Sequence, residues 1–267
     1  DEVILRLDDV HLTLGDNVIL SGVKEEIRNV KRPGHSQGQV VALLGPSGIG
    51  KSQLFRLLAG LQQPTKGRIL VTEKLVPVRQ GMVGVVTQNY VVFDHRTVLG
   101  NLVIAGKCAG MSSDEAETKS MELLKRFKLD KKANHYPAQL SGGQRQRVAI
   151  AQQLIQRSHF LLMDEPTTGL DPIMVEEVCS FINEVAEMDE LNTIIVSTHS
   201  LTSAALIADT IWMLGSDKDE RGNRTGGARI MQTYDLAEMG LAWRQGLATT
   251  PEYARFVTEL RTRFYTL

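Results

Sequence analysis

One octapeptide constrains this chain more than any other stretch, the glycine-rich segment GPSGIGKS at residues 45–52. It follows an apolar run, 40–44, and precedes a segment, 54–59, whose apolar residues fit one face of a helix. A strand, a turn with the spacing G-x-x-x-x-G-K-S and a helix are together typical of a loop that binds phosphate. The glycines let several N–H groups point at a polyphosphate, and the positive end of the helix dipole faces the same anion.

Two side chains of this loop predict further contacts with a nucleotide. Lys51 can reach the β- and γ-phosphates, and the Ser52 hydroxyl can ligate Mg²⁺. The same few fixed positions also occur by chance at surface turns that bind nothing. The choice between the two interpretations therefore depends on other polar residues along the chain.

The composition excludes several kinds of protein. The chain has 267 residues, 42% of them hydrophobic, so it can bury a sizeable core, yet no window of 18 uninterrupted apolar residues predicts a membrane span. A net charge of −1 provides no overall positive field that would attract nucleic acid, although it does not exclude a local basic patch. Cys108 and Cys179 form neither a disulfide framework nor a metal-ligand spacing. We expect a protein of a reducing, intracellular compartment without a signal peptide.

The apolar patterns predict strands and helices in three stretches of the chain. Short strands are expected before the phosphate loop, helices from about 97 to 134, and buried parallel strands alternating with helices after that. The expected strands are 3–7, 10–14, 18–20, 68–72, 82–87, 159–163, 193–197, 210–214 and 230–231. The expected helices include 115–129, with a capped start at Ser112, 145–155, 175–188 and two segments in the tail, and the expected loops include 31–38 and 217–229.

Polar residues follow three of the predicted buried strands, namely Gln88, the pair Asp164 and Glu165, and His199. Adjacent carboxylates at the end of an apolar strand are costly unless a metal ion, a proton or a cation meets them. We expect Asp164 to hold Mg²⁺ together with Ser52, Glu165 to polarise an attacking water, and His199 to donate to the γ-phosphate. Each residue also has a structural interpretation, as a helix cap, a surface charge or a packed histidine.

A second glycine-containing turn occurs at Leu140–Gln144, with the sequence LSGGQ, directly before the predicted helix 145–155. Backbone N–H groups at such a helix start can receive a second anion.

Taken in this order, the motifs resemble those of the ATP-binding subunit of an ABC transporter over about residues 3–215. The resemblance rests on the phosphate loop, the glutamine Gln88, the signature LSGGQ, the strand 160–164 with Glu165, the turn 169–171 and the switch histidine His199. It implies an α/β fold: a P-loop NTPase core with a mostly parallel sheet, an N-terminal antiparallel β layer and an inserted α-helical subdomain. The implied core comprises residues 1–88 and 157–267, and the implied helical subdomain comprises 89–156.

The resemblance also implies ATP and Mg²⁺ as cofactors and a role for each matching residue. It assigns nucleotide binding to Gly45, Pro46, Ser47, Gly48, Gly50, Lys51, Ser52, Gln53, Ser141, Gly142, Gly143, Gln144 and Asp171. It assigns metal binding to Ser52, Gln88 and Asp164, and catalysis to Lys51, Gln88, Glu165 and His199.

The implied partners are a second ATPase subunit, a separate transmembrane permease and, as a further candidate, a solute-binding protein. In a head-to-tail homodimer or heterodimer, ATP would lie between the phosphate loop of one subunit and Ser141, Gly143 and Gln144 of the other, with Asp171 at the seam. The permease would dock near residues 90–97, and the helical subdomain would move about Gln88. The implied location is cytoplasmic, peripheral on the inner face of the membrane, without nucleic acid.

Three positions depart from the family pattern. Leu14 stands where an aromatic residue usually stacks on adenine, Gln53 replaces the usual threonine, and the segment 217–229 is longer than the usual tight turn. The preferred function is ATP hydrolysis that energises import of a small polar solute. The alternatives left open are an exporter ATPase, a soluble ABC protein acting on DNA or ribosomes, and a regulatory module that binds nucleotide without turnover.

Overall fold

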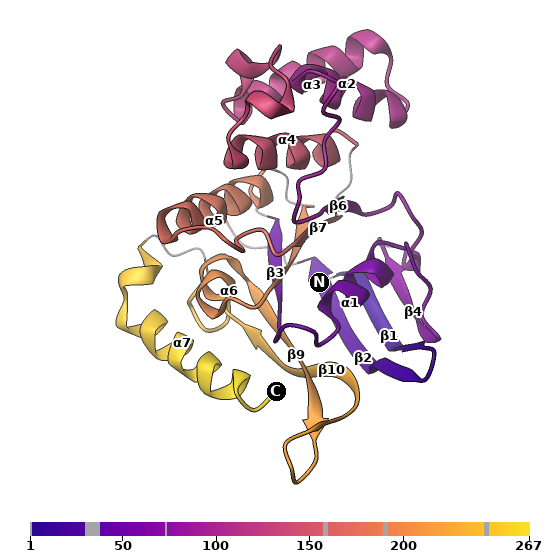
Figure 1. Ribbon diagram of the computed structural model, residues 1–267, viewed down its shortest axis with the longest axis vertical. Coiled ribbons are helices and arrows are strands. Elements are labelled where there is room, and N and C mark those ends of the chain that lie inside the picture. The colour runs from indigo at the N-terminus through magenta and orange to yellow at the C-terminus, as the bar shows by residue number, and fades with distance from the viewer. Residues whose placement is uncertain (1, 30–37, 73, 157–159, 189–191, 243–245) are drawn as a thin grey trace.

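The computed structural model describes residues 2–29, 38–72, 74–156, 160–188, 192–242 and 246–267 (Figure 1). The described strands form one sheet in the order β5-β4-β1-β2-β10-β9-β3-β8-β7-β6. These strands are β1 (Glu2–Leu14), β2 (Asn17–Asn29), β3 (Gln39–Leu44), β4 (Lys66–Val71), β5 (Val76–Pro77), β6 (Gly84–Val86), β7 (Phe160–Asp164), β8 (Thr193–Thr198), β9 (Thr210–Lys218) and β10 (Arg224–Asp235). The described α-helices are α1 (Lys51–Leu58), α2 (Val98–Cys108), α3 (Ser113–Arg126), α4 (Gly142–Leu154), α5 (Pro172–Ala186), α6 (Leu201–Ile207) and α7 (Pro251–Phe264).

The parallel half of the sheet is centred on β3, which pairs in parallel with β8 and β9. Residues 40–44 of β3 are each at most 2% exposed, with alternate side chains in different core clusters, because helices or strands cover both faces. Strand β7 lies between β8 and β6 in the same direction. The carboxyl ends of β3, β8, β7 and β6 therefore lie along one edge, as predicted.

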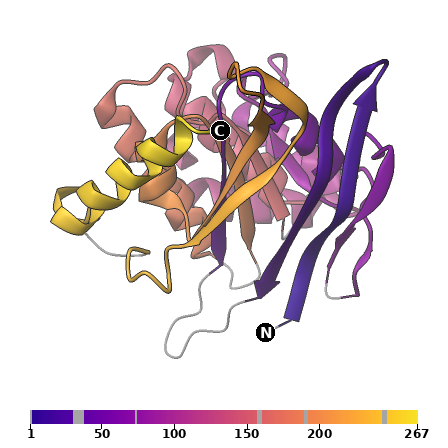
Figure 2. The same cartoon turned by 90° about the horizontal axis from the view of Figure 1, so that it is seen from below.

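The antiparallel half begins with β1 and β2, two long strands instead of the predicted short ones (Figure 2). They turn at Gly15, whose φ of 59° suits a two-residue hairpin. A break in the ladder follows Leu7, and Asp9 adopts a φ of 52° there. Strand β1 stays paired on both sides of this irregularity. The charged residues 8 and 9, which suggested a break between two short strands, therefore lie within β1. A parallel pairing between Leu20 of β2 and Ala228 of β10 joins this half to the rest of the sheet.

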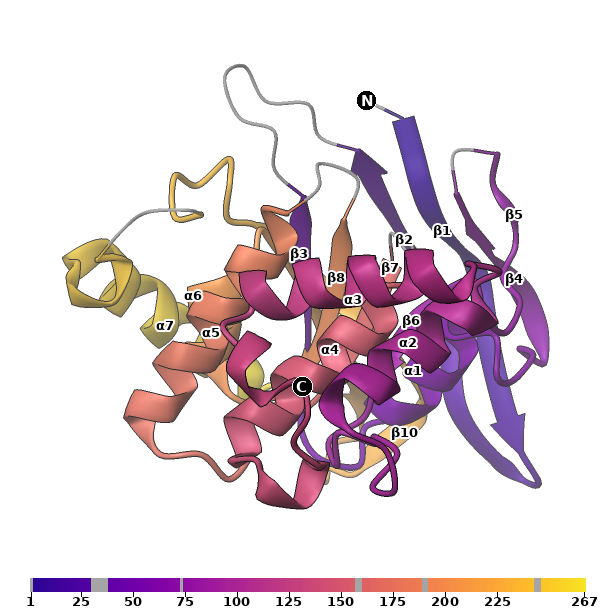
Figure 3. The ribbon, with the colours of Figure 1, turned by 90° about the horizontal axis from the view of Figure 1, so that it is seen from above.

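Three apolar clusters of described residues hold the helices to the sheet. Helix α1 packs between the antiparallel strands and one face of the parallel strands, and α2, α4 and α5 cover the other face. Helices α6 and α7 pack on β3 and β9 through a third cluster. Helices α2, α3 and α4 gather at one end of the molecule, in front of the strands when seen from that end (Figure 3).

The predicted loop 217–229 is wrong, because β9 and β10 continue through most of it as a hairpin. Arg229 of β10 makes two contacts with the carboxylate of Asp217 on β9, at 2.6 and 2.8 Å. The charged residues that suggested a loop therefore form an ion pair between the two strands. The turn is confined to 219–223, where Asp219 accepts hydrogen bonds from two backbone N–H groups.

Other predicted boundaries also changed. Within the described part of the tail, the α-helix α7 follows a short 3-10 helix at Leu247–Thr249, so of the two predicted helical segments only one is α-helical there. Helix α3 ends at Arg126. The capped start is confirmed, since Ser112 Oγ accepts from the N–H of Glu115 at 3.2 Å. The predicted loop 31–38 falls, except for Gly38, outside the described residues.

Candidate nucleotide site

The phosphate loop joins the end of β3 to the start of α1, at the edge where the parallel strands end. Gly48 and Gly50 have φ values of 75° and 113°, which side-chain-bearing residues rarely adopt. A Cβ on Gly45 would lie 2.7 Å from the carbonyl oxygen of Leu214, so only glycine fits there. Because the first turn of α1 has N–H groups without acceptors in the helix, the loop presents donors and a positive dipole end to an anion.

The ammonium of Lys51 folds back over this loop. Its Nζ donates to the carbonyl oxygens of Gly45 at 2.7 Å and Pro46 at 3.2 Å, and lies 3.4 Å from Glu165 Oε1. The side chain is only 7% exposed. Burial lowers the pKa of Lys51, and the charge of Glu165 opposes that shift. The structure thus joins the phosphate loop to the end of β7 through a buried ion pair.

Asp164 and Glu165 are held by a neighbouring strand. Ser197, which is fully buried in β8, donates from Oγ to Asp164 Oδ1 and accepts from the N–H of Glu165 at 3.1 Å. The N–H of Glu165 also reaches the carbonyl oxygen of Ser197 at 3.1 Å. The two carboxylates therefore keep a defined orientation at the end of the strand.

Glu165 is also the partner of His199. Glu165 Oε2 lies 2.9 Å from His199 Nδ1 and accepts from Thr168 Oγ1 at 2.9 Å. The imidazole is half-exposed, with 47% of its side-chain surface accessible, so it can meet a ligand at the loop. The structure thus brings Lys51, Glu165 and His199 together from three strand ends.

The other predicted residues of this half lie at the ends of strands, in the phosphate loop and on the first turn of α1. Gln88 is exposed in the turn after β6, whose Val86 pairs with Met163 of β7. Ser52 is exposed on the first turn of α1, while Pro46, Ser47 and Gly48 complete the loop. Gln53 Oε1 is buried without a hydrogen-bond partner among the described residues. Leu14, at the end of β1, is 41% exposed.

The LSGGQ turn lies apart from the phosphate loop, at the start of α4 (Figure 1). Ser141 Oγ accepts from the N–H of Gln144 at 3.3 Å, and Gln144 Oε1 accepts from the N–H of Ser141 at 3.1 Å. This reciprocal cap places Gly142 and Gly143 in the first turn of the helix, where the sequence had suggested a turn before it. Ser141 and Gly142 are exposed, so their N–H side is open to an anion from outside the chain.

Asp171 caps helix α5. Its Oδ1 accepts from the N–H groups of Ile173 at 3.0 Å and Met174 at 3.1 Å. The residue is exposed, and the neighbouring Ile173 is 72% exposed. The structure therefore gives Asp171 a local role as a cap and leaves its predicted place at a dimer seam as a proposal.

Sequence reasoning missed Ser197 and Thr168, which hold the two carboxylates in place. A signal for Ser197 was present, because a serine within the apolar run 193–197 must find a hydrogen-bond partner once the strand is buried. Thr168 carried no such signal, since threonine is common in turns.

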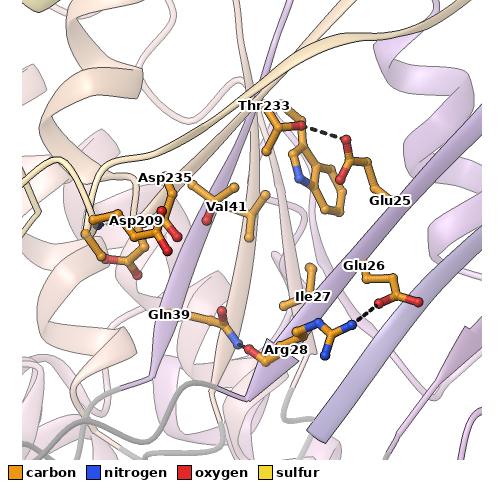
Figure 4. Close-up of a pocket in the computed structure, with 13 residues that line it drawn as sticks. Glu25, Glu26, Ile27, Arg28, Gln39, Val41, Asp209, Thr233 and Asp235 are labelled. Atoms are coloured by element: carbon orange, nitrogen blue, oxygen red, sulfur yellow. Dashed lines mark hydrogen bonds and ion pairs between the residues drawn. The ribbon is translucent and has the colours of Figure 1, made fainter. Parts of the chain in front are cut away.

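A separate hollow of about 500 Å³ opens between the end of β2 and the starts of β3 and β9 (Figure 4). In it, Glu26 pairs with Arg28 at 2.8 Å and Glu25 accepts from Thr233 at 2.6 Å. Gln39, at the start of β3, lines the hollow, whereas the phosphate loop follows the other end of that strand, roughly 17 Å away. None of the predicted site residues lines this hollow, so it is distinct from the nucleotide site.

No α-helix within the described residues is long and apolar enough to cross a membrane. Those residues also contain no group of three His, Cys, Asp or Glu side chains that could hold a metal ion without other ligands.

Comparisons with known proteins agree with this geometry. Residues 34–168 match the family model described as ABC transporter. The chain is 39% identical over 188 residues to the arginine transport ATP-binding protein ArtP of Haemophilus influenzae, covering 66% of this chain and 76% of that protein. It is 35% identical over 219 residues to the probable amino-acid import ATP-binding protein YxeO of Bacillus subtilis, covering 78% of this chain and 84% of that protein.

Solved structures show the same fold. The structure of cbiO1 from Clostridium perfringens, part of the ABC transporter complex cbiONQ, superposes with a TM-score of 0.75 at 25% identity, covering 98% of this chain and 100% of that one. An ATP-binding cassette solved as a dimer in a post-hydrolysis state, bound to ADP and Pi, gives a TM-score of 0.64 at 26% identity. The match covers 87% of this chain and 99% of that one.

Proposed function

This chain belongs to the ABC transporter family and is an ATPase of that family, and we propose that it energises import of a small polar solute through a separate membrane subunit. The convergence of Lys51, Glu165 and His199 at the phosphate loop carries the proposal of hydrolysis. The names of the relatives, which include arginine transport and amino-acid import, support amino acids as the solute class.

Each residue has a proposed task. Lys51 and the loop N–H groups bind the β- and γ-phosphates. Glu165 orients and polarises the attacking water, and His199 contacts the γ-phosphate while its Nδ1 stays on Glu165. Gln53, with a buried oxygen, lies where a contact to the α-phosphate would form. Leu14 supplies apolar cover for adenine in place of a stacked ring.

The donor set fits Mg²⁺. Ser52, Gln88 and Asp164 offer only hard oxygen ligands, and they include a single carboxylate. Mg²⁺ in nucleotide sites takes one or two carboxylates and completes its coordination with phosphate oxygens and water, so the lack of an all-protein cluster among the described residues suits it. When bound, the ion would neutralise charge that develops on the phosphates.

A second ATPase subunit completes the proposed site. The exposed capped turn at Ser141, with Gly142, Gly143 and Gln144, would face the nucleotide held by a partner's phosphate loop, and Asp171 would lie at the seam. The dimeric cassette among the structural relatives supports this arrangement. The proposed permease contact is the surface around 90–97, which places the chain on the inner face of the membrane, with a solute-binding protein as a further proposed partner.

Residues 89–156 form the proposed helical subdomain, which would move relative to the core of 1–88 and 157–267. Gln88, next to the end of β7, would act as the hinge that senses Mg²⁺ and the γ-phosphate.

Transport into vesicles tests the function. The chain and the polytopic membrane protein that co-purifies with it are placed in vesicles, with MgATP on the side of the chain and radiolabelled arginine or sulfate on the other. We expect ATP-dependent movement of the amino acid toward the compartment that holds the chain. With the label placed instead on the side of the chain, ATP-dependent movement away from the chain would contradict import. Recovery of ribosomes or DNA in place of a membrane protein would favour the soluble alternative.

A further inference from the structure

The phenol of Tyr90 reaches across the molecule to the turn that carries Glu165. Its hydroxyl donates to the carbonyl oxygen of Pro166 at 2.9 Å, and this bond joins residues 76 positions apart in the chain. The Pro166 residue is buried, and the ring of Tyr90 packs against the core cluster under the helices. Burial raises the pKa of Tyr90 to about 12, so the phenol keeps its proton even near pH 10, where an ordinary tyrosine is half ionised.

The turn on which Tyr90 acts has a strained backbone. Glu165 adopts a φ of 49°, in the left-handed region that residues other than glycine, asparagine and aspartate seldom visit. Such a conformation persists only where the surroundings hold it in place. On one side of Glu165, its N–H is held by Ser197. On the other side, the N–H of Thr168 donates to its carbonyl oxygen at 3.2 Å, and Tyr90 holds Pro166.

Tyr90 is itself held by the helical end of the molecule. It has a φ of 45°, and its N–H donates to the carbonyl oxygen of Thr87 at 2.9 Å. The Nε of Arg145, on the first turn of α4, donates to the carbonyl oxygen of Tyr90 at 3.4 Å. Arg145 also pairs with Asp94 at 3.1 Å, which fixes the segment after Tyr90 to the same helix.

We propose that Tyr90 is a positioning residue that ties the orientation of Glu165 to the position of helix α4. The proposal rests on the catalytic role of Glu165 given above. Three parts of the chain meet at Tyr90: the segment after Gln88, the helix that begins with LSGGQ, and the turn after β7. A displacement of α4 relative to the strands moves the Tyr90 carbonyl through Arg145, and the phenol passes that movement to Pro166, one residue from Glu165.

The test compares the substitution Tyr90→Phe, which removes only the hydroxyl, with Tyr265→Phe at a tyrosine that is 77% exposed. For each variant, kcat and KM for ATP, equilibrium ATP binding and the urea midpoint are measured on the full chain. We expect Tyr90→Phe to lower kcat roughly five- to tenfold, because Glu165 loses a constraint on its turn, with KM and ATP binding near native. The urea midpoint should fall modestly, since the buried carbonyl of Pro166 loses its donor. Tyr265→Phe should match the native chain in every measurement.

A double variant separates positioning from general damage. If Tyr90 acts through Glu165, adding Tyr90→Phe to Glu165→Gln should leave the single-turnover rate of the latter unchanged, because the group being positioned is already inactive. A native kcat for Tyr90→Phe, a parallel rise in KM, or a further loss in the double variant would overturn the inference. If Glu165→Gln itself turned over at the native rate, the proposed function and this inference would both fail. If Glu165→Gln were inactive and Tyr90→Phe had the native kcat, only the inference would fail.

Discussion

Lys51 Nζ lies 3.4 Å from Glu165 Oε1, so the proposed phosphate-binding cation and the proposed catalytic carboxylate form an ion pair in the structure. Both side chains are largely buried, at 7% and 17% exposure. A polyphosphate that binds Lys51 must therefore compete with Glu165 for the ammonium, and once it succeeds the carboxylate keeps its contact with His199 and becomes available to the attacking water. Nucleotide binding and the orientation of Glu165 therefore both depend on which group pairs with the Lys51 ammonium.

The first prediction concerns Glu165→Gln. Removing the charge should leave ATP affinity at least as high as in the native chain, because the amide competes less for Lys51. Steady-state turnover should fall roughly 100-fold or more, as expected when a general base is lost, and ATP should trap a dimer. Titration with a fluorescent nucleotide, phosphate release, and size-exclusion chromatography with MgATP measure these three effects. The control is Glu177→Gln on the exposed side of α5, and native turnover in Glu165→Gln would remove this residue from catalysis.

Lys51→Ala should weaken ATP binding by roughly 10- to 100-fold, the range expected for losing a charge-assisted hydrogen bond in a buried site. Titration with a fluorescent nucleotide measures the dissociation constant. Lys74→Ala, at an exposed lysine, provides the matched control. Equal affinities in the two variants would contradict the assignment of the phosphate loop.

Two serines separate helix capping from a role toward a partner's nucleotide. Ser112 and Ser141 each cap a helix by accepting from the N–H three residues on, at 3.2 and 3.3 Å. Ser112→Ala and Ser141→Ala should each lower the free energy of unfolding by about 1 kcal/mol. Only Ser141→Ala should also lower ATP turnover of the dimer. Equal turnover in both variants would leave Ser141 as a cap and nothing more.

The buried thiol of Cys179 predicts a loss of stability in alkaline solution. Burial, aided by the charge of Glu176, raises the pKa of Cys179 from 9.0 to about 12. Since the unfolded chain releases this proton first, the stability is complete below pH 9 and falls as pH rises from there toward 12, by up to about 1.4 kcal/mol per pH unit.

Urea unfolding at pH 8, 9 and 10 measures this slope, and because tyrosines with an ordinary pKa near 10 also begin to ionise in this range, a comparison of two variants isolates the thiol. Cys179→Ala should flatten the decline between pH 9 and 10, whereas Cys108→Ala, at the exposed cysteine, should leave it as it is. A decline of the same slope in both variants would assign it to other groups.

The chemistry of this protein was readable from local sequence. The order of strand, glycine turn and helix at 45–52, and the carboxylates at 164 and 165 after an apolar run, depend on short-range backbone geometry and on the cost of burying charge, which residue types and spacing express directly. The edge of the sheet that gathers these residues followed from the rule that parallel strands end together.

Contacts between distant segments depended on the tertiary structure. Whether charged residues at 217–229 form a loop or pair across a hairpin is decided by the strand that lies opposite, and Asp217 finds Arg229 only once β9 and β10 align. The hydrogen bonds of Ser197 to Asp164 and of Tyr90 to Pro166 likewise join residues that no local pattern relates. The spacing of side chains in the sequence shows which donors and acceptors each segment carries. Which of them become hydrogen-bond partners depends on how the segments pack, and only the folded chain defines that packing.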